Sequence, residues 1–62
     1  MFRLIATMRR GSASWMPQAS TRYASIEAAR LGAAEMLKED RVLRVMVVLN
    51  QIPTLFVEWQ ER

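Results

Sequence analysis

Closely spaced acidic residues are the strongest candidates for chemistry in this sequence. Glu35 and Glu39 stand four residues apart, which would place both carboxylates on one face of a helix, and Asp40 follows directly. Two carboxylates can act as general acid and general base when burial drives their pKa values apart. Lys38 and Arg41 stand among these acids, and such a mixed charged stretch is typical of a solvated helix end. We therefore expect no catalytic role for them.

The sequence lacks the two side chains that active sites and metal sites use most often. It contains no His and no Cys, so it has no general base that titrates near neutral pH, no thiolate nucleophile and no nitrogen or sulfur ligands for zinc. Its serines consequently have no base to activate them. With only two glycines it forms neither a dinucleotide-binding loop nor a P-loop. We predict a protein that is not an enzyme, with no catalytic residues, no metal and no cofactor.

Basic residues are concentrated in the first third of the chain. Residues 1–22 contain four arginines and no acid, whereas the remaining residues carry a net charge of −1. A basic segment suits an anionic partner such as nucleic acid, although it also serves as a solvated edge that opposes aggregation. An exposed Phe56 would add a surface on which bases could stack. The alternative prediction is therefore a nucleic-acid-binding protein that uses Arg3, Arg9, Arg10, Arg22 and Arg44.

The elements that position these side chains are clearest at the C-terminal end, where two apolar runs flank a turn at Asn50 to Pro53 and predict a β-hairpin. The number of loop residues decides which side chains share a face. A two-residue loop would place Glu58 opposite an apolar side chain, and an unpaired buried carboxylate is strongly destabilising. We expect a loop of three or five residues, with facing pairs Leu49 and Leu55, Val47 and Val57, and Val45 and Trp59.

The N-terminal segment has two interpretations. Residues 2–9 alternate between side chains that would face inward and outward, which predicts a strand. Residues 1–25 are also rich in Arg and Ser and free of acids, as transit peptides are. We favour the strand, because removing that segment would leave too few residues for a self-standing domain.

A helix is predicted over residues 26–39, because Ser25 is a good N-cap and the apolar residues after it recur at helical spacing. The segment before it is harder to assign. Gly11 marks a turn, after which residues 13–16 form either a short edge strand that ends at Pro17 or part of an irregular loop over residues 10–24.

These elements predict a single small α+β domain over residues 1–62, in the order β(β)αββ. Its sheet has three or four strands, antiparallel or mixed, with one helix packed on one face and a C-terminal hairpin. A chain this short has a limited core, and without disulfides or zinc an oligomer is the remaining means of adding stability. No apolar run approaches the roughly 20 residues of a membrane-spanning helix, so we expect a soluble, cytoplasmic protein.

One helix covers only one face of a sheet. The opposite face would combine an apolar centre with a charged rim, in which Arg44 and Glu58 lie diagonally across the two hairpin strands. Such a face has the anatomy of a protein interface, unless Trp15, Tyr23 or the segment around them folds over it. We predict a non-enzymatic interaction module that binds a second copy of itself or another protein through this face or an edge strand. The predicted interface residues are Ile5, Arg44, Met46, Val48, Phe56 and Glu58.

Overall fold

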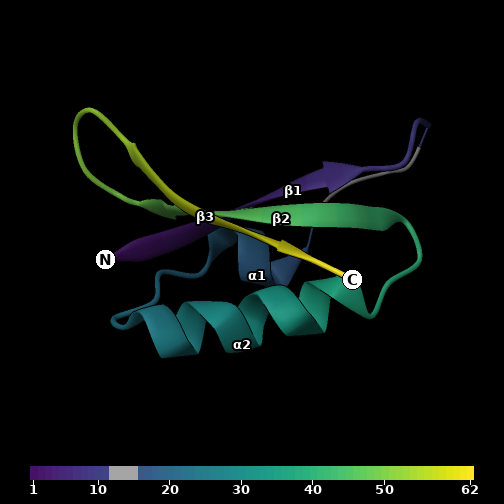
Figure 1. Ribbon diagram of the computed structural model, residues 1–62, viewed down its shortest axis with the longest axis horizontal. Coiled ribbons are helices and arrows are strands. Elements are labelled where there is room, and N and C mark those ends of the chain that lie inside the picture. Colours follow the sequence, from purple (N-terminus) through teal and green to yellow (C-terminus); the bar gives the residue numbers. More distant parts are fainter. Residues whose placement is uncertain (12–15) are drawn as a thin grey trace.

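The fold is a three-stranded antiparallel sheet with helices on one side (Figure 1). The computed structural model describes residues 1–11 and 16–62. Both of its helices lie on the same side of the sheet, and together they make a second layer. The α+β class is therefore confirmed. The elements are β1 (Phe2–Met8), α1 (Pro17–Ser20), α2 (Ile26–Leu37), β2 (Val42–Leu49) and β3 (Leu55–Glu61).

The strand order is β1-β2-β3, so β2 lies in the middle and both of its neighbours are antiparallel to it. A mixed sheet, which the sequence left open, is not what forms. After β1 the chain passes through both helices and then forms β2, which lies beside β1 and runs in the opposite direction. The hairpin between β2 and β3 is present as predicted, with the five residues 50–54 between the two strands.

Pro17 begins helix α1, although the sequence suggested that it would end a strand. Its ring holds φ near the helical value, and it lacks the N–H that a first helical turn would leave unpaired. Met16, the last residue of the expected strand, is extended and serves as the N-cap. The rest of that expected strand, residues 13–15, lies outside the described residues. The sheet therefore carries two helices where the sequence predicted one.

Helix α2 begins as the sequence predicted. The Ser25 hydroxyl accepts a hydrogen bond from the Ala28 N–H at 3.1 Å, which satisfies a donor that the first helical turn leaves unpaired. Glu27 places a negative charge in that turn, where the helix dipole favours it. The helix ends at Leu37, two residues earlier than expected, with Lys38 as the C-cap.

We expect the substitution Ser25→Ala to lower the free energy of unfolding by about 1 kcal/mol, because one N–H at the helix start loses its acceptor. Urea denaturation followed by far-ultraviolet circular dichroism measures this loss. The matched control is Ser20→Ala, whose exposed hydroxyl donates to the Pro17 carbonyl at 3.1 Å, a group that water can reach. Equal losses in the two variants would contradict a capping role for Ser25.

The hydrophobic core lies between the sheet and α2. The helix contributes small side chains, Ala29 and Ala33, which allow it to approach the sheet closely, and the sheet contributes branched ones. Met16 at the start of α1 completes one end of the core. The buried members of this cluster are Leu4, Met16, Ala29, Ala33, Met36, Val42, Val45 and Val47.

A β-bulge in the hairpin overturns part of the predicted register. Leu49 faces Leu55 as expected, but the register shifts between Val47 and Val48, so that Val47 faces Glu58. Val57 is the extra residue, which makes the predicted pair of Val47 with Val57 wrong. The same shift replaces the predicted pair of Val45 with Trp59 by Val45 with Gln60 and Met46 with Trp59. Beyond the bulge, each β3 side chain therefore lies on the face opposite to the one predicted.

Candidate functional site

The face of the sheet that points away from the helices, called here the outer face, holds the main group of exposed aromatic residues. Its position follows from the register, because side chains of directly paired residues share a face. Ile5 pairs with Met46, Met46 pairs with Trp59, and none of the three belongs to the core cluster. The outer face, as defined by this register, consists of Arg3, Ile5, Thr7, Arg44, Met46, Val48, Phe56, Trp59 and Glu61.

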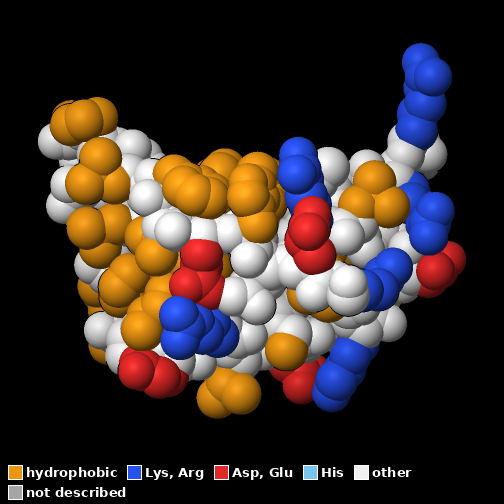
Figure 2. Space-filling model, viewed as in Figure 1, with side chains coloured by type: hydrophobic (Ala, Val, Ile, Leu, Met, Phe, Trp, Pro, Cys, Tyr) orange, Lys and Arg blue, Asp and Glu red, His pale blue; other side chains and the backbone are white. Residues whose placement is uncertain are grey.

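The apolar part of the outer face is accessible to a partner. Phe56 is 56 % exposed, and Trp59 and Ile5 are each 39 % exposed. Val48 is only 2 % exposed, so it is covered by its neighbours and offers a partner little surface of its own. Figure 2 shows hydrophobic side chains grouped along the upper part of the molecule, where the sheet lies, with a basic and an acidic group next to them. An apolar centre beside charges is therefore present.

Two side chains, Arg44 and Phe56, hold Trp59 in place on this face. The Arg44 guanidinium lies over the Trp59 ring, with 3.8 Å between its central carbon and the ring centroid. The Phe56 and Trp59 rings are tilted by 53° with their centroids 5.9 Å apart. Arg44 also approaches Glu61, with 3.9 Å between Nη1 and Oε1. A cation–π contact at an exposed site contributes roughly 0.5–1 kcal/mol, enough to restrict the indole before any partner binds.

Glu58 does not belong to the outer face, which corrects one of the six predicted interface residues. Its carboxylate faces the helical layer, where Arg30 of α2 donates to Oε1 at 2.8 Å and to Oε2 at 3.0 Å. Gln60 donates a further hydrogen bond to Oε2. The predicted diagonal pair of Arg44 with Glu58 does not form, and Arg44 pairs with Glu61 instead. The hydrogen bonds from Arg30 lower the pKa of Glu58 and raise the pKa of Arg30.

This pair makes stability depend on pH in a definite direction. Because the folded-state pKa of Glu58 is lowered, its contribution is present above the unfolded-state value and is lost as the pH falls through the folded-state value. We expect the urea midpoint of the wild type to fall more steeply between about pH 5 and about pH 3 than that of Glu58→Gln. Arg30→Gln should flatten the curve in the same way, and parallel curves for all three proteins would contradict the assignment.

Tyr23 lies on the helical side, so it does not cover the outer face. Its backbone pairs with that of Phe2, and its ring end lies against Gly32 of α2. The other residue considered as a cover, Trp15, is outside the described residues. Of the segment between residues 10 and 24, α1 also lies on the helical side of the sheet.

The five predicted nucleic-acid residues are spread over the molecule. Arg3 and Arg44 belong to the outer face, where Arg3 lies on β1 and Arg44 on β2 without facing each other. Arg9 is engaged with Asp40, donating from Nε to its carbonyl at 2.7 Å and approaching its carboxylate at 3.5 Å. Arg10 follows the C-terminal end of β1, whereas Arg22 precedes Tyr23 at the opposite end, roughly 20 Å away along a strand of this length. The structure therefore does not bring all five together.

The acidic residues first considered for chemistry are all exposed and all near cations. Glu35 accepts from Lys38 at 2.9 Å and Glu39 from Arg41 at 3.0 Å. Asp40 is the partner of Arg9. Within residues 1–11 and 16–62, no group of three or more possible ligand side chains is placed to hold a metal ion.

Among the described residues, no helix is both long enough and apolar enough to cross a membrane. Comparison with known proteins found no matching family model, no matching curated protein and no matching solved structure.

Proposed function

We propose that this chain is a non-enzymatic interaction module that forms a homodimer through its outer face. The observation that carries the proposal is the pair of aromatic rings in tilted contact, Phe56 and Trp59, which stay exposed on a sheet face that no described residue covers. Aromatic residues that are already ordered lose little conformational entropy on binding and dominate the energetics of interfaces. Met46 lies between Trp59 and Ile5 in the register, and this row gives the face an apolar centre.

The charges on this face favour a second copy as the partner. Arg44 and Glu61 lie close together at one end of the face and carry opposite signs. A two-fold axis presents the same patch on both copies, so the arginine of one copy can meet the glutamate of the other. A chain of 62 residues also gains more from burying additional apolar surface than a larger domain would.

The size of the face sets the expected affinity. Three strands about 4.8 Å apart and about 23 Å long span roughly 300 Å² in projection. A standard stable interface buries about 800 Å² on each partner. We therefore expect a reversible dimer with a dissociation constant in the micromolar range.

Sedimentation velocity between about 1 µM and about 500 µM tests the proposal, because a micromolar dimer changes its average mass across that range. We expect the sedimentation coefficient to rise with concentration and to level off at the value of a dimer. A protein that remains a monomer at the highest concentration would contradict homodimerisation.

A second function, binding of single-stranded nucleic acid, is favoured by one specific observation. The guanidinium of Arg44 over the indole of Trp59, with Phe56 beside it, combines a cation with stacking surfaces on an open sheet. Proteins that bind single strands use this combination. Fluorescence anisotropy with a labelled oligonucleotide should then show an affinity that falls steeply with added salt. No binding at low ionic strength removes this function.

A further inference from the structure

The loop of the hairpin and the residue after it form an apolar tip at one end of the sheet. This hairpin tip, residues 50–55, contains Ile52, which is fully exposed, and Leu55, which is also exposed. Residues 45–57 carry no charged side chain, and this is the longest uncharged run in the sequence. The loop projects away from the helical layer in Figure 1, and in the same view Figure 2 shows hydrophobic side chains there without a charged group beside them. The tip therefore exposes apolar surface that the core does not use.

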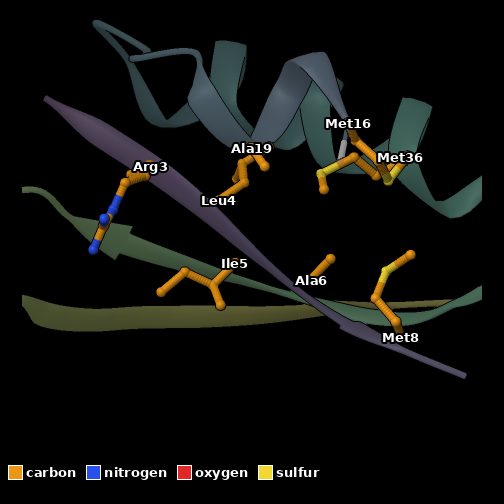
Figure 3. A pocket seen from close by; sticks show the side chains of 8 residues that line it. All are labelled: Arg3, Leu4, Ile5, Ala6, Met8, Met16, Ala19 and Met36. Atoms are coloured by element: carbon orange, nitrogen blue, oxygen red, sulfur yellow. The ribbon is translucent and has the colours of Figure 1, made fainter. Parts of the chain in front are cut away.

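The cavity beneath β1 is a different kind of apolar surface. It has a volume of about 320 Å³ and is lined by side chains from β1 and both helices (Figure 3). Its lining includes Leu4, Met16 and Met36, which belong to the buried core cluster. A partner could reach these side chains only by disturbing the packing of the core. The hairpin tip needs no such rearrangement.

The apolar side chains at this end of the hairpin lie on both sides of it. Leu55 faces Leu49, which stands two residues from the core residue Val47 and therefore lies on the helical side. The next residue, Phe56, belongs to the outer face. A protein partner covers one side of a hairpin, whereas lipid surrounds whatever enters it. Two strands about 4.8 Å apart also offer far less than the roughly 800 Å² that a stable protein interface buries on each partner. A narrow apolar tip of this shape suits shallow insertion into a membrane.

The loop satisfies several of its own polar groups. The Asn50 N–H donates to the Met1 carbonyl at 2.7 Å, and the Gln51 N–H donates to the Leu49 carbonyl at 3.0 Å. The Thr54 hydroxyl donates to the Gln51 carbonyl at 3.3 Å. A polar group that is already paired costs much less to move from water into an apolar layer than an unpaired one does. These hydrogen bonds therefore lower the cost of insertion.

Two arginines lie near the base of the hairpin tip. Arg3 faces Val48 in the register, and Figure 3 shows its side chain on the side of β1 away from the helices, next to the end of β2 that leads into the loop. Arg22 is exposed and precedes Tyr23, whose backbone bonds to Phe2 at the same end of the sheet. Neither arginine makes a hydrogen bond or ion pair with another residue in the described ranges, and the Nε of Arg3 is buried without an acceptor. Both can therefore serve an anionic partner.

The acids around the hairpin tip leave this positive charge in place. Glu58, the first acid after the loop, is neutralised by Arg30. Glu27 stands in the first turn of α2, in the layer from which the loop projects away. The base of the tip therefore keeps two arginines that a negatively charged surface would attract.

We propose that the hairpin tip inserts into the headgroup layer of an anionic lipid membrane. Ile52 enters deepest, and Arg3 and Arg22 bind lipid phosphates at the base of the tip. The dimensions fit, because the middle of the loop lies at most roughly 10 Å beyond the last strand pair, and interfacial segments insert by about 5–10 Å. Arginine suits phosphate because its planar head donates two hydrogen bonds at once. Ile52 and Leu55 do not belong to the outer face, so the proposal does not depend on homodimerisation.

Co-sedimentation of the full chain with lipid vesicles tests the choice of partner. The probe is a phosphatidylcholine vesicle that contains about one third phosphatidylserine, and the control is a vesicle of phosphatidylcholine alone. We expect at least roughly tenfold tighter binding to the anionic vesicles, because each arginine near the surface adds to the attraction, and we expect high salt to remove this difference. Equal binding to both vesicles overturns the proposal. No binding to either one also overturns it and leaves a protein surface as the occupant of the tip.

The substitution Ile52→Gln locates the contact on the protein. It should weaken binding to the anionic vesicles by at least roughly tenfold, because it removes a large apolar side chain from the inserted segment. Ile52 is fully exposed, so the change leaves the core intact. The matched control is Leu31→Gln, the same kind of change at an exposed position of α2, which should leave binding unchanged. Equal losses in the two variants show non-specific adsorption and overturn the proposal.

A fluorescent label reports whether the tip enters the lipid. Because the sequence contains no cysteine, Gln51→Cys carries a single environment-sensitive fluorophore next to Ile52. Anionic vesicles should shift its emission to the blue, whereas the same label on Leu31→Cys should keep its emission. An unshifted label at position 51 means that the tip stays in water, which overturns insertion.

The Trp59→Ser background separates this proposal from homodimerisation. We expect Ile52→Gln to weaken vesicle binding by the same factor in that background as in the wild type, because Trp59 lies on the outer face and outside the tip. If Ile52→Gln has no effect on vesicle binding once Trp59 is replaced, the membrane contact requires the dimer and an independent hairpin site is ruled out.

Discussion

The substitution Trp59→Ser should raise the dissociation constant of the homodimer by about a hundredfold, which corresponds to roughly 2.7 kcal/mol at 25 °C. The indole is the largest exposed side chain on the outer face, and both Arg44 and Phe56 hold it in one orientation. Removing it deletes apolar area and leaves Arg44 without its stacking partner. Sedimentation equilibrium over a concentration series measures the change.

The control for this experiment is Leu31→Ser, because Leu31 is 71 % exposed on α2 and belongs to the helical layer. The change also replaces a large apolar side chain by serine, so it accounts for any general loss of surface hydrophobicity. We expect its dimer to be as tight as that of the wild type. If Leu31→Ser weakens the dimer as much as Trp59→Ser does, association is non-specific and the outer face is not the interface.

Local patterns in the sequence predicted the elements that depend on neighbouring residues. The apolar spacing after Ser25 identified α2, and the alternation in residues 2–9 identified β1. The odd number of residues between the hairpin strands was also predicted correctly. Pro17 was assigned to the end of a strand, because proline stops a strand and starts a helix equally well. Only the packing of Met16 and α1 beneath the sheet distinguishes the two.

The bulge at Val57 could not be predicted, because Arg30, the partner that accommodates Glu58 on the helical side, lies 28 residues before Glu58 in the sequence. Loop length alone leaves Glu58 as an unpaired carboxylate, which favours a position on the solvent side. Arg30 reaches it from α2 with two hydrogen bonds, so the position on the helical side is satisfied. The same shift moves Trp59 to the outer face. No local spacing in the sequence connects Arg30 with Glu58, so neither their ion pair nor the register shift could be predicted from neighbouring residues.

The substitution Gly32→Ala should destabilise the protein by about 1–3 kcal/mol, although alanine is the better helix former. A Cβ at this position would lie 2.6 Å from Cζ of Tyr23 and closer still to its hydroxyl oxygen. The ring has little freedom to move, because the Tyr23 backbone is fixed by its two hydrogen bonds to Phe2. Chemical denaturation of the two proteins gives the difference.

A double-mutant cycle with Tyr23→Leu separates the clash from every other effect of the alanine. Leucine lacks the ring end that meets the new Cβ, so in that background the same change should be neutral or should stabilise by up to about 1 kcal/mol, the propensity difference between glycine and alanine. A reversal of sign between the two backgrounds requires direct contact between the residues. If Gly32→Ala stabilises the wild type as well, the ring is free to move, and Tyr23 does not fix the N-terminal end of β1 against α2.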